Sequence, residues 1–176
     1  GDEIQQRGSR VDDERLRFDF SHTQSMTTAE VETTEQLVTK AIQDNLLVDA
    51  EEVSLTKAKE IQGVRAEFGA HYPDPVRVVS IGATVKDLIN DPPNTKWYDC
   101  SVEFCGGAHV QKGGEGEHFV IVQEQALASG IRRSLALTGS AAYTTSENGM
   151  AIVQRISSLN ELEGSALALE YDALSQ

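Results

Sequence analysis

Alternation of hydrophobic and polar residues predicts a strand near the start of the chain. Residues 16–20 read Leu-Arg-Phe-Asp-Phe, which places Leu16, Phe18 and Phe20 on one face and the two charged side chains on the other. A period of two is typical of a half-buried strand. Later segments with strand patterns of alternating or β-branched residues are 76–81, 100–104, 118–123 and 131–137.

A long helix is predicted after this first strand. Thr-Thr-Ala-Glu at residues 27–30 has the form of a capping box, in which the hydroxyl and the carboxylate accept hydrogen bonds from free amides of the first turn. The residues that follow place one stripe at helical spacing: Val31, Thr34, Val38, Ala41, Ile42 and Asn45. We expect the helix to run to about residue 46 and to pack this stripe on a sheet.

The hydrophobic period changes again after about residue 140. Residues three or four apart form an amphipathic stripe: Ile152, Ile156, Leu159, Leu162, Ala166, Leu169 and Ala173. Gly149 and Gly164 weaken this helix by roughly 1 kcal/mol each relative to alanine. We interpret the stripe as a packing surface for a neighbour, and it favours self-association through the C-terminal helix.

These elements predict an α+β fold, with a mostly antiparallel sheet packed on a long helix and followed by a C-terminal amphipathic helix. The boundary between the two parts falls near residue 139. Residues 1–139 are expected to form the main domain, and residues 140–176 are expected to form a helical appendage that leads to the next domain.

Composition limits the partners that this fold can have. The 176 residues include 15 Lys and Arg against 28 Asp and Glu, which gives a net charge of −13 and excludes a general basic coat for nucleic acid. No apolar run approaches the roughly 20 residues of a membrane span, no secretory signal opens the sequence, and two cysteines cannot form a disulfide framework. The chain opens on Gly1 in polar sequence, so we expect a segment of a longer intracellular protein.

The segment Cys-Gly-Gly-Ala-His at residues 105–109 is the strongest candidate for chemistry. A thiolate and an imidazole joined by two glycines can turn back onto one metal ion, and zinc binds both donors in a tetrahedral site. A single Cys-x3-His pair is a weak signal for zinc by spacing alone, and it would supply only half of the ligands. The alternative is a buried Cys105 that ends a strand beside a surface His109.

Three other histidines are candidates for completing a site. His22 follows the first strand and either approaches the site or is a hydrogen-bonded core residue. His118 opens a strand, and His71 lies beside a proline turn where we expect it to be solvated. None of them has a second ligand at metal spacing.

Arginines are concentrated in two parts of the sequence. Four lie in the first 17 residues (Arg7, Arg10, Arg15 and Arg17), and Arg132 and Arg133 are adjacent at the start of a strand. Ordinary surface ion pairing with the many acids is the default interpretation of any one of them. As a group they are the candidates for contacts with RNA phosphates, since the sequence contains no nucleotide-binding glycine motif.

Five ordered segments together resemble the editing domain of alanyl-tRNA synthetases. They are Gln-Arg-Gly-Ser at 6–9 with Leu-Arg-Phe-Asp-Phe-Ser-His at 16–22, Val-Arg-Val-Val-Ser-Ile-Gly at 76–82, Ser-Val-Glu-Phe-Cys-Gly-Gly-Ala-His at 101–109, Ser-Gly-Ile-Arg-Arg at 129–133 and Leu-Thr-Gly at 137–139. The resemblance runs in register from about residue 4 to residue 139. The tail resembles the helical segment that follows the editing domain in that family.

The resemblance implies an aminoacyl-tRNA hydrolase activity. The expected reaction is hydrolysis of the ester that joins serine or glycine to the 3′-terminal adenosine of the tRNA for alanine. A pocket for alanine cannot exclude glycine by size and rejects a hydroxyl poorly, so a second site has to remove the errors. The parent enzyme would be a cytoplasmic ligase that joins alanine to this tRNA, with ATP and Mg²⁺ confined to its catalytic domain.

The family also implies roles for particular residues. Its editing pocket holds zinc through a His-x3-His pair and a Cys-x3-His pair, and Cys105 and His109 match the second pair. Gln6 matches a pocket glutamine that binds substrate or water, and His22 is assigned a supporting place beside the site. The arginines expected to contact the tRNA are Arg7, Arg17, Arg132 and Arg133.

Two departures from the family pattern and two alternatives accompany this interpretation. The His-x3-His pair would lie upstream of Gly1, and Ala108 stands where the family usually has threonine. One alternative is a free-standing trans-editing protein or the editing domain of threonyl-tRNA synthetase, although the long tail favours a full synthetase. The other is a non-catalytic module for tRNA docking or oligomerisation.

Overall fold

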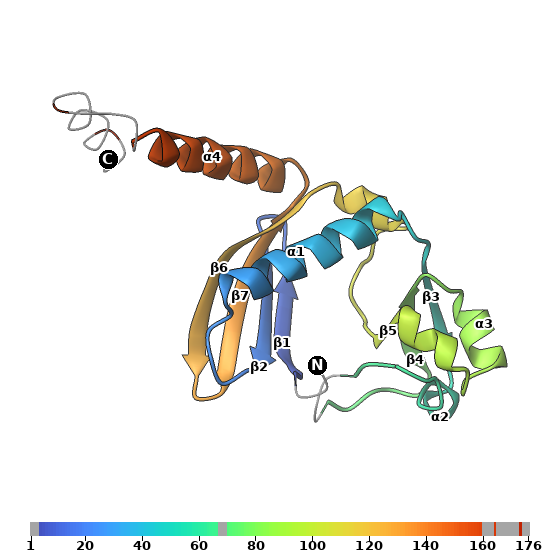
Figure 1. Cartoon of the computed structure of the whole chain (residues 1–176). Helices are drawn as coiled ribbons and strands as arrows, with labels where there is room; N and C mark the ends of the chain where they lie inside the picture. The colour runs from blue at the N-terminus through green and yellow to red at the C-terminus, as the bar shows by residue number, and fades with distance from the viewer. Residues whose placement is uncertain (1–3, 67–69, 160–163, 165–172, 174–176) are drawn as a thin grey trace.

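The computed structural model describes residues 4–66 and 70–159, together with Gly164 and Ala173. Two antiparallel sheets lie beside one another, and α1 (Thr28–Gln43) runs from the face of one sheet toward the other (Figure 1). This arrangement confirms the predicted α+β class. The prediction of one sheet on one long helix is too simple, because the strands divide between two sheets that the helix connects.

The four-stranded sheet brings the two ends of the main fold together. Its order is β1 (Gln6–Val11), β2 (Leu16–Ser21), β7 (Ile131–Thr138) and β6 (Phe119–Ala128). Every neighbouring pair is antiparallel, and β2 pairs with β7 across more than a hundred residues of sequence. The central pairing therefore joins an N-terminal hairpin to a C-terminal hairpin.

The three-stranded sheet carries most of the buried core. Its order is β3 (Val48–Val53), β4 (Val76–Ile81) and β5 (Ser101–Phe104), all antiparallel. Three short helices cover it: α2 (Leu55–Ala58), α3 (Val85–Asn90) and the 3₁₀ helix η1 (Thr95–Asp99). The core residues come from both layers and are Ala58, Ile61, Val76, Val78, Val85, Leu88, Trp97, Val102 and Phe104.

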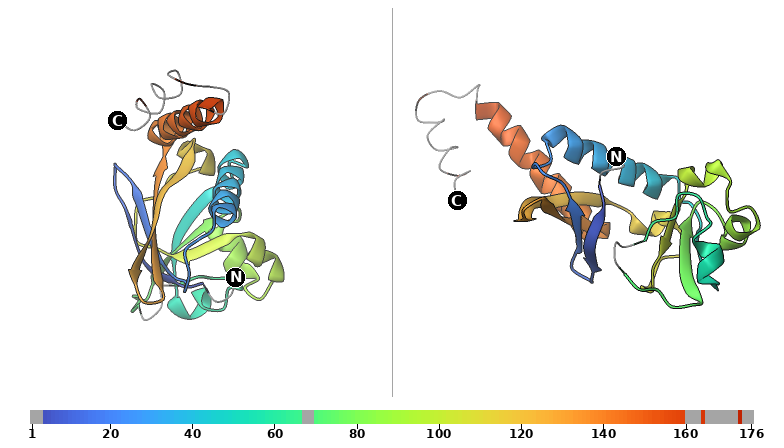
Figure 2. Two further views of the ribbon diagram at one scale, coloured as in Figure 1. Left: turned by 60° about the vertical axis from the view of Figure 1, so that its left-hand side comes forward. Right: turned by 90° about the horizontal axis from the view of Figure 1, so that it is seen from below.

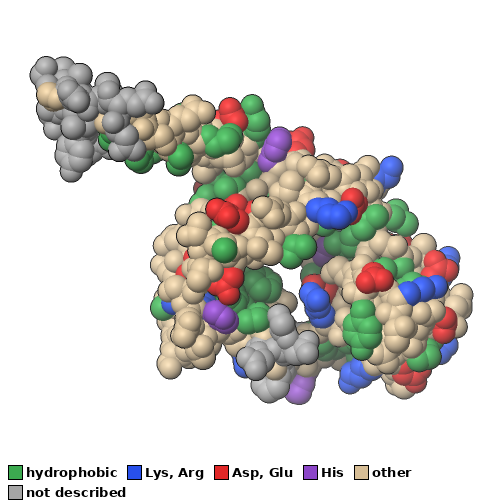
Figure 3. All heavy atoms as spheres, viewed as in Figure 1, with side chains coloured by type: hydrophobic (Ala, Val, Ile, Leu, Met, Phe, Trp, Pro, Cys, Tyr) green, Lys and Arg blue, Asp and Glu red, His purple; other side chains and the backbone are tan. Residues whose placement is uncertain are grey.

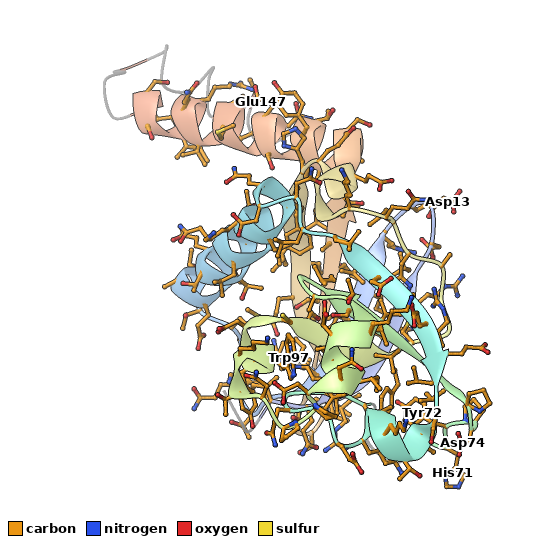
Figure 4. The ribbon with its side chains drawn as sticks, turned by 90° about the vertical axis from the view of Figure 1, so that its right-hand side faces the viewer. Asp13, His71, Tyr72, Asp74, Trp97 and Glu147 are labelled. Atoms are coloured by element: carbon orange, nitrogen blue, oxygen red, sulfur yellow. The ribbon has the colours of Figure 1, made fainter. Side chains whose placement is uncertain are left out.

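Polar contacts fix the edges of this core. The indole Nε1 of Trp97 donates to the carbonyl of Asp91 at 2.7 Å, which satisfies the one polar atom of a buried ring. Tyr72 packs edge-on against Phe104 with ring centroids 5.1 Å apart. Figure 4 shows Tyr72 near Asp74, whose carboxylate accepts a hydrogen bond from the amide of Leu55 at 3.0 Å.

The helix α1 begins as the capping box predicts. Thr27 Oγ1 accepts from the amide of Glu30, and the Glu30 carboxylate accepts from the amide of Thr27 at 2.7 Å. The predicted stripe is only half-buried, since α1 contains no fully buried residue. At its far end, Asn45 Oδ1 accepts from the amide of Gly114 in η2 (Gly113–Gly116), which ties the helix to the loop that leads back from the three-stranded sheet.

The last helix, α4 (Gly139–Ser158), leaves directly from β7 and extends beyond the four-stranded sheet (Figures 1 and 2). Only Ala142 is buried, and a ring contact of 5.0 Å between Tyr143 and His118 holds the base of the helix. Ile152 and Ile156 of the predicted stripe are 49% and 52% exposed. Leu162, Ala166 and Leu169 lie outside the described residues.

The positions of the predicted strands agree with the structure more closely than their end points do. The strands predicted at 16–20, 76–81, 100–104 and 131–137 correspond to β2, β4, β5 and β7, while β6 starts at Phe119 and runs five residues beyond the predicted end. The sequence analysis missed β1, β3 and α3. Among the described residues, no helix combines the length and the apolar composition that crossing a membrane requires.

Candidate metal-binding loop and arginine clusters

The loop of residues 105–109 follows β5 directly and brings the two predicted donors to one place. Cys105 is half-buried at the end of the strand, whereas His109 is exposed. A Cβ built on Gly107 would lie 3.6 Å from Cys105 Sγ and 3.9 Å from His109 Cε1. Both side chains therefore border the space beside Gly107.

The backbone of this loop is held by two neighbouring groups. The Nη1 atom of Arg77, on β4, donates to the carbonyls of Cys105 at 2.8 Å and Gly107 at 2.7 Å. The Nδ1 atom of His109 lies 2.9 Å from the same Gly107 carbonyl. Since a carbonyl only accepts, Nδ1 is the donor of that bond, and in the neutral ring Nε2 then carries the lone pair.

Cys105 and His109 would supply two of the donors of a metal site. No group of three or more His, Cys, Asp or Glu side chains arranged for a metal ion occurs in the part of the chain that the structure describes. The donor chemistry of Cys105 and His109 suits zinc, which needs four donors in a structural site or three and a water in a catalytic one. Their assignment as ligands stays a prediction.

Cys100 provides a contrast within the same strand region. It lies before β5, packs against the core, and sits 3.6 Å from the position of a Cβ on Gly82. Burial raises the pKa of the Cys100 thiol and so favours its protonated form. Cys100 is thus the less available of the two thiols as a metal ligand.

Gln6 lies on β1 and His22 directly follows β2, so both belong to the region of the four-stranded sheet rather than to the loop of residues 105–109. The Gln6 amide donates to Ser9 Oγ at 3.1 Å. The Nδ1 atom of His22 lies 2.7 Å from the carbonyl of Gln24, and its ring is 6.4 Å from that of Phe20. Both side chains therefore form hydrogen bonds with residues close to them in sequence, and their roles at a metal site stay predictions.

A hydrophobic groove of about 690 Å³ lies between α1 and the four-stranded sheet. The predicted apolar face of β2 lines it, and Phe18 is still 37% exposed there. The other apolar side chains of the groove are Ile4, Leu16, Phe20, Met26, Ala29, Val38, Phe119, Ile121 and Ala136. Figure 3 shows hydrophobic side chains in the central hollow between the two sheets.

Arg132 and Arg133 both form internal ion pairs. Arg132 pairs with Glu124, with Nη2 to Oε2 at 2.6 Å, and Arg133 binds both carboxylate oxygens of Asp19 at 2.7 and 2.8 Å. Each guanidinium lowers the pKa of its partner carboxyl by hydrogen bonding. These arginines stabilise the sheet, and their assignment as tRNA contacts stays a prediction.

The N-terminal arginines lie together on the opposite face of the same sheet from α1. A recess of about 390 Å³ is lined by three of them (Arg10, Arg15 and Arg17) and by Arg133 of β7, with Asp12, Glu14, Gln125 and Leu135. Arg17 directly opposes Arg10 in the β1–β2 register. Arg10 and Arg15 belong to the arginine group noted in the sequence but not to the four residues expected to contact tRNA, although the hairpin places them beside Arg17.

Other ionic contacts partly neutralise this recess. Arg10 Nε lies 3.3 Å from Asp12, and Arg17 Nε lies 3.6 Å from Asp19. Arg7, which lies on β1 like Arg10, donates to the side-chain oxygen of Gln5 at 3.0 Å. Arg15 has an exposed side chain at the hairpin turn, where it is well placed to meet an anion.

Comparisons with known proteins agree with these features. Residues 76–133 match the family described as the threonyl and alanyl tRNA synthetase second additional domain, and this match includes the loop of residues 105–109. An alanine–tRNA ligase of Candida albicans is 51% identical over 162 residues, which cover 92% of this chain and 17% of the relative. The cytoplasmic alanine–tRNA ligase of Dictyostelium discoideum is 45% identical over 99% of this chain and 18% of its own length.

A mitochondrial alanine–tRNA ligase of Saccharomyces cerevisiae is 47% identical over 81% of this chain and 14% of its own length. The fold and the loop thus define an editing-type domain of the kind shared by threonyl- and alanyl-tRNA synthetases. The chain belongs to the alanyl-tRNA synthetase family. It spans less than a fifth of the length of these three relatives.

The Asp19–Arg133 pair makes a testable contribution to stability. Because the folded-state pKa of Asp19 is lowered, its stabilisation is fully present above the unfolded pKa of about 3.9 and is lost as the pH falls through the folded value. Asp19→Asn should lower the free energy of unfolding by about 3 kcal/mol at pH 7, and the difference from the native chain should shrink below pH 4.

Urea unfolding followed by Trp97 fluorescence between pH 2.5 and 7 measures this difference. Asp13→Asn is the matched control, since Asp13 is exposed at the hairpin turn (Figure 4). A deficit in Asp19→Asn that stays constant across the range would contradict the ion-pair explanation.

Proposed function

We propose that this chain is the editing segment of an alanyl-tRNA synthetase and hydrolyses serine or glycine from the tRNA for alanine. The observation that carries the proposal is the convergence of Cys105 Sγ and His109 beside Gly107, in a segment that matches an editing-type domain. In the reaction, a water oxygen attacks the ester carbonyl carbon. The bond to the 3′ oxygen breaks, that oxygen takes a proton, and free amino acid leaves.

Zinc is the metal that this donor set suits, and Cys105 and His109 would hold it. Bound zinc would polarise the ester carbonyl, orient the aminoacyl end or lower the pKa of a water molecule. The remaining donors are proposed to come from the upstream His-x3-His pair that the family resemblance implies. Within the chain, the contact of His109 Nδ1 with the Gly107 carbonyl and the position of the half-buried Cys105 beside Gly107 support this assignment.

Gln6 is proposed to bind the aminoacyl group or a water molecule. It lies on β1 opposite Phe20, where a small register shift interrupts the β1–β2 pairing. Its amide carries both a donor and an acceptor, which suits a substrate with an ammonium group and an ester. The supporting observation is its half-buried position on the sheet that borders the central hollow.

Contacts with tRNA phosphates are proposed for the recess around Arg10, Arg15 and Arg17, and for Arg7, which lies on β1 with Arg10. The recess gathers a quarter of the positive side chains of a protein whose net charge is −13, since four of 15 Lys and Arg line it. Arg132 and Arg133 would act indirectly, by fixing the strand that carries the recess. Aminoacylation, ATP, Mg²⁺ and the cytoplasmic location are proposed for the parent protein by analogy with the relatives.

A longer chain that includes the upstream histidines tests the editing proposal. It should bind about one zinc ion per chain and deacylate seryl-tRNA for alanine, and Cys105→Ala should reduce both to background. Metal analysis and release of labelled serine are the measurements. Cys100→Ala is the control because that thiol packs against the core, and equal deacylation by Cys105→Ala would overturn the role of Cys105.

The arginine recess predicts a change in salt dependence. Arg15→Ala should weaken binding of tRNA and reduce the slope of log affinity against log salt by about one, because one phosphate contact is lost. Filter binding at several salt concentrations measures both. Lys86→Ala removes the same charge from α3, beside the other sheet, where Lys86 pairs with Glu51 at 3.7 Å, and should leave the slope unchanged. An unchanged slope for Arg15→Ala would remove the recess from the interface.

Self-association is a second proposed function, and the exposed side of α4 favours it. Met150, Ile152, Val153 and Ile156 are each about half exposed or more on this projecting helix. Light scattering should give a dimer mass for the chain and a monomer mass after removal of residues 145–176. The double variant Ile152→Ser/Ile156→Ser should also be monomeric with its helix retained, and a monomer mass for the intact chain would contradict the proposal.

A further inference from the structure

Arg77 makes an unusual number of contacts with one short loop. Both hydrogens of its Nη1 atom are used, one on the Cys105 carbonyl at 2.8 Å and one on the Gly107 carbonyl at 2.7 Å. Its own carbonyl accepts from the amide of Cys105 at 3.3 Å. Residue 77 therefore holds the loop through its main chain and its side chain at once.

The loop is a segment whose conformation needs such support. Gly106 and Gly107 are exposed, and a Cβ on Gly106 would meet nothing within 4 Å. Adjacent glycines give a chain the greatest backbone freedom. Hydrogen bonds from a charged guanidinium are stronger than neutral ones, so Arg77 supplies an effective restraint from a strand buried in the core.

Arg77 is linked to His109 through the carbonyl oxygen of Gly107. The Gly107 carbonyl accepts from Arg77 and also from Nδ1 of His109 at 2.9 Å, which uses its two lone pairs. With Nδ1 protonated, Nε2 is the nitrogen that can bind a metal. A carbonyl that moved would release the ring and allow the other tautomer.

We propose that Arg77 is the positioning residue of the Cys105–His109 pair. Its guanidinium fixes the Gly107 carbonyl, and this carbonyl selects the His109 tautomer with a free Nε2 beside the Cys105 thiol. The consequence for metal binding rests on the function proposed above, whereas the consequence for the tautomer does not.

Nitrogen-15 NMR of the histidine rings in the metal-free 176-residue chain tests the positioning directly. The native chain should show His109 in the Nδ1–H tautomer, assigned by loss of the signal in His109→Gln. Arg77→Met keeps the aliphatic stem but removes the donors, and it should give a mixture of tautomers. Arg77→Lys should restore the native signature, because an ammonium can donate to both carbonyls.

Two controls separate positioning from loss of fold. Arg65→Ala removes the same charge from an exposed side chain beside β5 and should leave the tautomer unchanged. Gly107→Ala keeps the carbonyl and should also retain the tautomer, although its methyl would lie between the two donors. If Arg77→Met does not fold, a mixture of tautomers in Arg77→Lys overturns the proposal and the native signature supports it. A native tautomer in folded Arg77→Met overturns it as well.

Cobalt binding by the chain extended upstream gives a second readout. The thiolate-to-cobalt absorption band should report an affinity roughly 10–100-fold weaker for Arg77→Met and close to native for Arg77→Lys. Gly107→Ala should bind cobalt poorly despite a native tautomer. If the native extended chain gives no such band, the zinc assignment fails, while the tautomer still decides the role of Arg77. Native cobalt affinity in Arg77→Met overturns the coupling of Arg77 to metal binding.

Discussion

The pairing of β2 with β7 is the constraint on which the rest of the structure depends. Six successive residue pairs join two hairpins that lie near opposite ends of the sequence of the main fold. The residues between these hairpins must therefore fold so that β2 and β7 can meet. The Asp19–Arg133 pair lies on the ladder itself, with both carboxylate oxygens bound by one guanidinium. A nearly buried carboxylate of this kind is stable only while its partner strand is in register.

The two sheets have different roles in the fold. The four-stranded sheet presents an apolar face toward α1 and a charged face on the other side, because side chains alternate along each strand. The three-stranded sheet is packed more densely and provides a rigid origin for the exposed loop of residues 105–109. Chemistry on a glycine-rich loop requires such a base, since the loop itself supplies little restraint.

How far the sequence predicted the structure depended on burial. The strands β2, β4 and β7 alternate or bury β-branched residues, so their periodicity is visible. The edge strands β1 and β3 read Gln-Arg-Gly-Ser-Arg-Val and Val-Asp-Ala-Glu-Glu-Val, and their mostly polar or acidic side chains hide the strand. The division into two sheets depends on which strands pair with one another, and local sequence patterns do not predict this pairing.

The same reasoning applies to the candidate site. Cys105 and His109 could be predicted to lie together because only three residues separate them in the chain. The contacts of Arg77 join residues about 30 positions apart and exist only through the β4–β5 register. The carboxylate partners of Arg132 and Arg133 lie on other strands, so their ion pairs could not be predicted from the local sequence.

The long separation between β2 and β7 also orders the assembly of the chain during synthesis. All three strands of the sheet that spans Val48 to Phe104 leave the ribosome before β7 has been made, so this unit can collapse first. Until then, the edge of β2 in the N-terminal hairpin stays unpaired. Its partner strand β7 becomes available only when residues 131–138 emerge. A nascent chain stalled before that point would carry an unfinished sheet edge, which is the kind of surface that chaperones shield and that aggregates otherwise.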